Sequence, residues 1–369
     1  MRIAFIVETL GSGGAEKQLY YMVRALRQSG ASIRLYAILV CPPYDDMIRS
    51  LGVDIIPIRS NHGRFYDMLM LIKEIRRYAP HFVQASHFPC NPYAALAART
   101  VDAVDIGAIR NDGLRDVESV AFGGKLYLHC NKALICNSEA AHSNLLSLGR
   151  SRRNLFILPN VIDLAQHDRV ELSENIPGIE DDVFKVIAVG GMHFPVKRFD
   201  VFLKGLSLAS QQAPALRGYL IGDGPLRSGL ETLATNLGIS GIVNFLGQRR
   251  DVAAILKTMD VHVLPSDQEG FPNVVLEAMA SSLAVVTTRA GDAARLVEEG
   301  KTGFIIPFNS PEALAERIVL LYRNRQACKS FGDSGRIRIN REYSHVHLAE
   351  RLGSIYRTLN PQLDNYPKC

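Results

Sequence analysis

The sequence predicts an α/β protein made of two doubly wound parallel-sheet domains, and three observations support this. Short apolar runs alternate with amphipathic runs along the chain, which is typical of a parallel sheet with helices on both faces. The same order of elements starts again near residue 185. The length of 369 residues, with 47% hydrophobic and 21% charged side chains, suits two globular domains.

The first half opens on an apolar run at residues 3–10, followed by Gly11-Ser12-Gly13-Gly14 and a helical pattern over 15–28. This order is typical of a βαβ unit, so we expect a strand, a glycine turn and a helix. The same patterns predict strands at 33–40, 53–58, 82–85, 105–109 and 132–136, and helices at 65–78, 91–99, 124–130 and 139–148.

A polar, acidic stretch at residues 166–182 separates the two halves, and we place the domain boundary there, after residue 165. The second domain is expected over 166–345, followed by a C-terminal segment over 346–369. Strands are predicted at 185–189, 218–221, 243–246, 261–264, 284–288 and 303–306, and helices at 202–208, 226–237, 252–257, 273–280, 311–324 and 347–359. Two such domains leave a central cleft at the carboxyl ends of their strands, where open α/β sheets bind ligands.

Charge and cysteine content exclude several classes of protein. The formal net charge of +5 comes without the dense basic runs of a nucleic-acid binder. The six cysteines form no C-x-x-C pair, the first apolar run is too short for a signal peptide, and no stretch approaches the ~20 apolar residues of a membrane span. No D-x-D pair or His/Cys cluster with ligand spacing is present. We therefore expect a cytoplasmic protein without a metal or other cofactor.

The most informative segment is DQEGFPNVVLEAM at residues 267–279. Glu269 lies in a loop after an expected strand, and Glu277 lies eight residues on, inside the next helix. The start of that helix attracts anions, while carboxylates hold sugar hydroxyls or the diol of a ribose. Lys197 follows a strand and a glycine turn, which places its ammonium group over the cleft, where an anionic leaving group would lie. The alternatives are two solvated glutamates and a solvated surface lysine.

The glycine run at residues 11–14 does not predict a dinucleotide site. Its order is G-x-G-G instead of G-x-G-x-x-G, and the second strand ends at Cys41-Pro42-Pro43 without an acidic residue for a ribose. A tight turn with glycine for packing reasons alone remains an alternative.

In their order and spacing these motifs resemble the family 4 retaining glycosyltransferases of the GT-B fold. The resemblance rests on GSGGAEK, LPNVID, VGGMHFPVKRFD, LIGDGPLRSGLE, FLGQRRDV, the E-x7-E pair and TRAGDAARLVEEGKTGF. It implies that Glu269 contacts the donor sugar, Glu277 the nucleotide ribose and Lys197 the diphosphate, with Glu269 and Lys197 as the catalytic residues. The remaining expected donor contacts are Gly13, Gly14, Gly191, Arg198, Gly270, Phe271, Asn273 and Val274. For Arg198 the alternative is an exposed residue, or one that only assists Lys197.

Three positions depart from this family. Gly191 stands where members often have an arginine, so part of the diphosphate clamp is missing or supplied elsewhere. Arg110 and Asn111 stand where members carry a pocket histidine; together with His87, at the end of the preceding strand, they are the acceptor-side candidates. A structural histidine is the alternative for His87. Arg295 stands where the family often has a glutamate, and we assign it no catalytic role.

The resemblance implies a metal-independent, retaining transferase that moves a hexosyl or acetamidohexosyl unit from a nucleoside diphosphate sugar to a polysaccharide or lipid-linked oligosaccharide of the cell envelope. The alternative is a non-catalytic GT-B subunit that partners an active transferase. The changed positions favour that alternative, whereas the intact Glu269, Glu277 and Lys197 oppose it. The resemblance also implies that the last helix packs back on the first domain.

The positive charge lies entirely in the first half. Residues 1–165 hold 19 Lys and Arg against 14 Asp and Glu, and the remainder holds 23 of each kind. The basic, partly apolar segment 64–77 is a candidate for contact with anionic lipid at the inner face of the plasma membrane. An ordinary helix that covers the sheet is the alternative.

Overall fold

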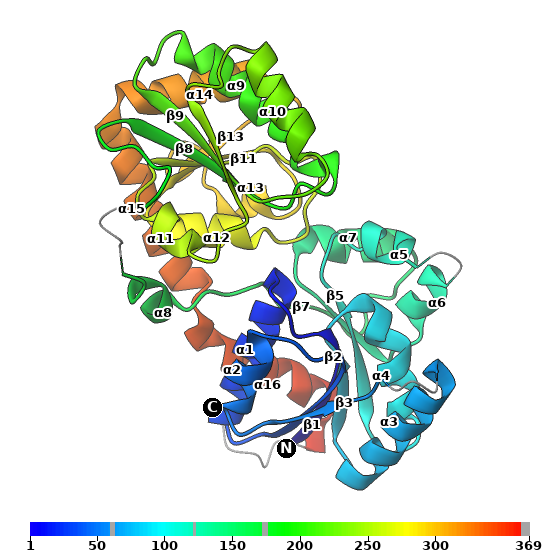
Figure 1. Cartoon of the computed structure of the whole chain (residues 1–369). Helices are drawn as coiled ribbons and strands as arrows, with labels where there is room; N and C mark the ends of the chain where they lie inside the picture. The colour runs from blue at the N-terminus through cyan, green and yellow to red at the C-terminus, as the bar shows by residue number, and fades with distance from the viewer. Residues whose placement is uncertain (60–62, 121–122, 172–175, 363–369) are drawn as a thin grey trace. The chain divides into compact units, whose positions relative to one another are not determined.

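The computed structural model describes residues 1–59, 63–120, 123–171 and 176–362. The chain forms two compact units: Met1–Val161 with His345–Cys369, and Ile162–Ser344. Figure 1 shows a sheet with flanking helices in each unit. Each strand expected from the sequence is present, with ends shifted by at most two residues, so the predicted fold class is confirmed. No helix within the described ranges combines the length and apolarity needed to cross a bilayer.

Unit 1 contains a seven-stranded parallel sheet in the order β3-β2-β1-β4-β5-β6-β7. Its strands are β1 Arg2–Thr9, β2 Ser32–Leu39, β3 Asp54–Pro57, β4 Phe82–Ala85, β5 Val104–Ile109, β6 Ala133–Cys136 and β7 Leu155–Ile157. Its helices are α1 Gly14–Gln28, α2 Tyr44–Arg49, α3 Arg64–Tyr78, α4 Asn91–Ala98, α5 Leu114–Glu118, α6 Gly124–His129, α7 Glu139–Ser147 and α16 Leu348–Leu359. Separate apolar clusters lie under α1, α2 and α16, under α3 and α4, and under α6 and α7.

The last helix, α16, is part of the core of unit 1. The Tyr356 hydroxyl donates to Oε1 of Gln84 in β4 at 2.6 Å, and its ring centroid lies 4.7 Å from that of Phe82. Leu352 and Ile355 are buried in the cluster that also holds α1. The apolar face of α16 therefore packs on a sheet whose strands lie more than 190 residues earlier in the chain.

Unit 2 contains a six-stranded parallel sheet in the order β10-β9-β8-β11-β12-β13. Its strands are β8 Phe184–Val189, β9 Leu216–Ile221, β10 Val243–Gly247, β11 Val261–Leu264, β12 Ala284–Thr287 and β13 Gly303–Ile305. Helices α9 Phe199–Ser210, α10 Arg227–Asn236 and α14 Pro311–Arg323 share one apolar cluster, and α11 Val252–Leu256, α12 Asn273–Ala280 and α13 Ala293–Leu296 share another. α8 Leu164–Asp168 and α15 Arg325–Glu342 complete the unit.

The sequence patterns did not predict α15, although it has 18 residues. Its buried positions are Cys328, Gly332, Gly335 and Ile339, so large apolar residues do not recur along it. A Cβ at Gly332 would overlap the carbonyl oxygen of Ser282, which shows that the helix approaches the neighbouring backbone closely. Four short helices, α2, α5, α8 and α13, and strand β7 were also not predicted. Part of the expected linker, residues 172–175, lies outside the described residues.

Both sheets reverse their strand order beside their first strand. In unit 1 the reversal lies between β1 and β4, and in unit 2 it lies between β8 and β11. Because successive crossovers diverge at such a point, the loops at the carboxyl ends of these strands leave room for a ligand. The fold thus places one candidate ligand position in each unit.

Candidate functional site

In unit 2, the loops after β8, β9, β11 and β12 are joined by backbone hydrogen bonds at the carboxyl end of the sheet. Met192 N–H donates to the carbonyl of Asp223 at 2.9 Å, which joins the β8 and β9 loops. Asp267 N–H donates to the carbonyl of Val196 at 2.8 Å, which joins the β11 and β8 loops. Asp292 N–H donates to the carbonyl of Gly270 at 3.0 Å, which adds the β12 loop. The four loops therefore form one connected surface.

Gly291 permits the close approach of the β12 loop to the loop that carries Glu269. Its φ of +53° is left-handed, and a Cβ at this position would overlap the carbonyl oxygens of Glu269 and Gly270. Only glycine adopts this conformation readily and also leaves room for the Glu269 loop. The position of the Glu269 backbone thus depends on a glycine more than 20 residues away.

Lys197 and Glu269 meet at this surface. Lys197 ends the short 3-10 helix Pro195–Lys197 after β8, and its Nζ donates to Oε1 of Glu269 at 2.8 Å. Ser266 Oγ donates to the same oxygen at 2.7 Å. The two side chains are 25% and 10% exposed, so the ion pair is shielded but reachable from solvent. Within the described residues Oε2 of Glu269 accepts no hydrogen bond, and an ammonium group with one bond retains two donors.

Asn273 and Glu277 extend the surface along α12. They are the first and fifth residues of the helix and so lie on one face of it, and both are half-buried. Phe271, by contrast, places its ring in the core, 5.7 Å from the ring of Tyr343, so it offers the site only backbone atoms. Val274 packs against the same core.

Gly191, where the resembling family often has an arginine, is exposed. A Cβ at the neighbouring Gly190 would lie 3.4 Å from the side-chain Cε of Lys197, so the lysine side chain runs along this glycine turn.

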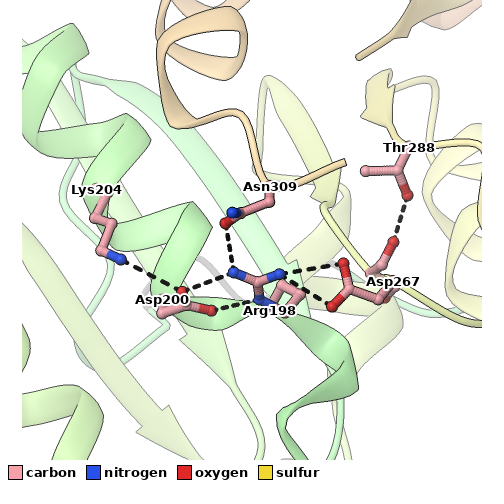
Figure 2. A network of polar contacts seen from close by, with 7 residues as sticks. Arg198, Asp200, Lys204, Asp267, Thr288 and Asn309 are labelled. Carbon is pink, nitrogen blue, oxygen red and sulfur yellow. Dashed lines mark hydrogen bonds and ion pairs between the residues drawn. The ribbon is translucent and has the colours of Figure 1, made fainter. Parts of the chain in front are cut away.

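Arg198 follows Lys197 directly but has different partners (Figure 2). Its guanidinium group donates to both carboxylate oxygens of Asp200, at 2.9 and 3.1 Å, and to both of Asp267, at 3.2 and 3.0 Å. It also donates to Oδ1 of Asn309 at 2.6 Å. Hydrogen bonds to Asp200, followed by those to Asp267, raise the pKa of Arg198.

Unit 1 holds a second polar cluster, at the reversal between β1 and β4. His87, just after β4, lies with Nε2 3.4 Å from Oε1 of Glu16 and with Nδ1 2.7 Å from Oγ of Ser86. Arg110, just after β5, donates from Nε to the carbonyl of Ser86 at 3.2 Å, and burial lowers its pKa to about 10. The structure thus brings His87 and Arg110 to the same residue, Ser86, the histidine to its hydroxyl group and the arginine to its carbonyl.

Sequence analysis missed Glu16. It lies in the first turn of α1 and is 7% exposed, and a Cβ at Gly13 would overlap its carboxylate. The signal was an acidic residue two positions after the last glycine of the turn, in GSGGAEK. Gly13 precedes α1 and Gly14 begins it, and both are exposed beside this carboxylate.

Asn111, the third acceptor-side candidate, bonds elsewhere. Its side-chain amide donates to Oδ1 of Asp116 at 3.3 Å, and its backbone N–H donates to Oδ2 of the same residue at 3.1 Å. Gly113 N–H also donates to Oδ2 of Asp116. These bonds shape the loop before α5. Among the residues that the structure describes, no group of three or more His, Cys, Asp or Glu side chains is placed to hold a metal ion.

Comparison with known proteins shows matches over both units. Residues 12–166 match the family described as Glycosyltransferase Family 4, and residues 183–324 match Glycosyl transferases group 1. The chain is 35% identical over 328 residues to the capsular polysaccharide biosynthesis glycosyltransferase CapM of Staphylococcus aureus, which covers 82% of this chain and 84% of that protein. It is 30% identical over 154 residues to the putative glycosyltransferase EpsD of Bacillus subtilis, spanning 42% of this chain and 40% of that relative.

Among solved structures, the HepE protein of Anabaena in complex with UDP-glucose superposes with a TM-score of 0.81 at 19% sequence identity. The match covers 98% of this chain and all of HepE. A likeness at this identity shows the fold alone, and the predicted GT-B fold is confirmed.

Proposed function

Because this chain belongs to the group 1, family 4 glycosyltransferases, we propose that it transfers a hexosyl or acetamidohexosyl unit from a nucleoside diphosphate sugar to a glycan acceptor, with retention of configuration. The observation that carries the proposal is the ion pair of Lys197 and Glu269 at the strand reversal of unit 2. It unites a cation suited to a diphosphate with a carboxylate suited to sugar hydroxyls.

The donor is proposed to bind on unit 2. Lys197 neutralises the diphosphate, the free Oε2 of Glu269 accepts from a sugar hydroxyl, and Glu277 holds the ribose diol. Backbone N–H groups of Gly270 and Asn273, at the start of α12, add donors for phosphate oxygens. HepE is described as binding UDP-glucose, which makes this the first donor to test.

In the proposed reaction, the bond between the anomeric carbon and the diphosphate oxygen breaks, and the bond from the acceptor oxygen forms on the same face of the sugar. The departing phosphate oxygen takes the proton that the acceptor hydroxyl loses, so no separate base is needed. Lys197 stabilises the negative charge that develops on the leaving group. We propose that no metal ion takes part, and transfer that persists at saturating EDTA would support this.

The acceptor is proposed to bind on unit 1, beside Glu16, His87 and Arg110. The buried carboxylate and the histidine provide hydrogen-bond partners for hydroxyls, and Arg110 adds positive charge. The name of CapM refers to capsular polysaccharide, which supports a polysaccharide or lipid-linked oligosaccharide of the cell envelope as the acceptor class. His87→Gln is expected to raise the KM for the acceptor and to leave donor affinity unchanged.

We also propose that unit 1 rests on a membrane surface through α3. Phe65, Tyr66, Leu69 and Met70 are exposed along this helix, at 38% to 79%, and Lys73, Arg76 and Arg77 are exposed near its end. Apolar side chains beside basic ones suit the surface of an anionic bilayer, which would place the protein at the inner face of the plasma membrane. Sedimentation with phosphatidylglycerol vesicles, but not with phosphatidylcholine vesicles, is the expected result.

The central experiment is a donor screen. Calorimetry against UDP-, GDP-, ADP- and CDP-sugars identifies the donor, and mass and anomeric analysis of the product identifies the transfer. Glu269→Ala is expected to abolish transfer, whereas Glu312→Ala, which removes an exposed carboxylate on α14, serves as the control and keeps full activity. Unchanged turnover in Glu269→Ala would refute the donor site. Donor binding without turnover would favour the non-catalytic subunit, and a product of inverted configuration would refute retention.

A further inference from the structure

Every nitrogen of the Arg198 guanidinium group already donates to a neighbouring side chain. Among the described residues its three nitrogens make five hydrogen bonds, two to Asp200, two to Asp267 and one to Asn309. The side chain is 19% exposed, and its φ of +50° is left-handed. A non-glycine residue in this conformation is unusual, and it is retained here at the junction of the 3-10 helix and α9.

The partners of Arg198 lie in three separate segments (Figure 2). Asp200 is the second residue of α9, Asp267 follows β11 and Asn309 follows β13. Asp267 stands two residues before Glu269 in the chain. Arg198 stands one residue after Lys197. The guanidinium group therefore joins the backbone that carries Lys197 to the backbone that carries Glu269, in parallel with the bond from Asp267 N–H to the carbonyl of Val196.

The charges around Arg198 also oppose a direct contact with a diphosphate. Lys204 Nζ lies 3.5 Å from Oδ2 of Asp200. The cluster therefore holds two cations, Arg198 and Lys204, and two carboxylates, Asp200 and Asp267, and their formal charges cancel. A diphosphate would have to displace at least one carboxylate from Arg198 before it gained a bidentate hydrogen bond. Lys197 has no such limit, because among the described residues its ammonium group donates a hydrogen bond to Glu269 alone.

We propose that Arg198 is a positioning residue, whose guanidinium group holds Lys197 and Glu269 at their relative positions. It is not a residue that contacts the nucleotide-sugar donor, as the sequence suggested. The proposal rests on the proposed function of the Lys197 and Glu269 pair. It also gives the adjacent cations separate tasks: Lys197 meets the leaving group, and Arg198 holds the loops that present it.

The decisive variants are Arg198→Lys and Asp267→Asn. Lysine keeps the positive charge but replaces the planar guanidinium group with one nitrogen, so it can bind a phosphate but cannot bond to Asp200, Asp267 and Asn309 together. Asp267→Asn removes a competing carboxylate, so it would leave donor binding equal or tighter if Arg198 were a ligand. We expect both variants to lower kcat/KM on the order of 10²-fold, because misplacing a catalytic group by about 1 Å has an effect of that size.

Arg217→Lys is the matched control. Arg217 pairs with both oxygens of Glu180 at 2.9 and 2.8 Å and is 22% exposed, but it stands at the opposite end of the sheet, near the start of β9. The kcat/KM of Arg217→Lys is expected to stay within about twofold of that of the unmodified protein, since surface substitutions away from a site have small effects. Arg198→Gly adds a second test. Glycine adopts the left-handed φ without strain but has no side chain, so a loss of activity in this variant comes from the missing guanidinium group and not from backbone strain.

A readout independent of turnover is amide hydrogen exchange of the ligand-free protein. The proposal predicts faster exchange in residues 190–198 and 265–270 for Arg198→Lys and for Asp267→Asn, and no change for Arg217→Lys. Unchanged exchange together with full activity in Arg198→Lys would overturn it. If the unmodified protein binds no nucleoside diphosphate sugar, the proposed function fails, whereas the exchange experiment still decides the role of Arg198.

Discussion

Gly291→Ala tests whether the close approach of the β12 loop sets the position of Glu269. The new Cβ would overlap the carbonyl oxygens of Glu269 and Gly270. Two costs are expected: about 1 kcal/mol for alanine at a φ of +53°, and about 1–3 kcal/mol for overpacking. If the Glu269 loop relaxes by about 1 Å to remove the overlap, kcat/KM should fall on the order of 10²-fold.

Gly300→Ala separates the two costs. Gly300 has a φ of +70°, and a Cβ there would meet no atom within 4 Å. This control should therefore lose only the conformational part, about 1 kcal/mol, and keep its activity. Urea unfolding followed by circular dichroism gives the free energies of unfolding, and a coupled nucleotide-release assay gives kcat/KM. Equal stability and equal activity in the two variants would refute the reasoning.

Three further outcomes are expected. Lys197→Ala leaves Glu269 without its cation and should lower kcat at saturating donor by about 10²- to 10³-fold; a kcat close to that of the unmodified protein would contradict this. Burial, aided by the charge of Lys197, lowers the pKa of His262 to about 3. As the pH falls below 6.5, the unfolded chain therefore binds a proton at this histidine while the folded chain does not, and the free energy of unfolding falls. His262→Val should reduce the loss of unfolding free energy between pH 7.5 and 5.5 by about 1.4 kcal/mol. Equal losses in the variant and in the unmodified protein, measured by urea titration at both pH values, would count against this prediction. Tyr356→Phe leaves the buried Oε1 of Gln84 without its donor and should destabilise unit 1 by about 1–3 kcal/mol in urea unfolding; an unchanged midpoint would exclude this role.

The strands other than β7 were predictable because each is a short, mainly apolar run. β4 and β11, for example, are buried at all four positions, and their ends match the prediction. α15 was not predictable in this way, since its contact face consists of small residues such as Gly332 that allow backbones to approach but do not repeat as large apolar side chains. Hydrophobic periodicity reports which faces are buried and says little about close backbone contacts.

The same distinction applies to the candidate site. Glu269 and Lys197 were selected from the sequence because each follows a buried strand and a turn, and in a parallel sheet such positions share one edge. Their 2.8 Å contact, however, depends on β8 and β11 being neighbours, a matter of strand order. Glu16 was missed for the corresponding reason: its partner, His87, stands 71 residues later, and only the pairing of β1 with β4 brings the two together.

The sequence by itself thus determined the fold class, the two-part organisation and the motifs of the glycosyltransferase family, because local periodicity and turn signals depend on residues that are close together in the chain. Only the tertiary structure decided the partners of each charged side chain. It gave the Arg198 side chain its three partners and paired Lys197 with Glu269. The physical reason is that hydrogen bonds and ion pairs depend on positions in space, and strand order sets those positions between residues far apart in the chain.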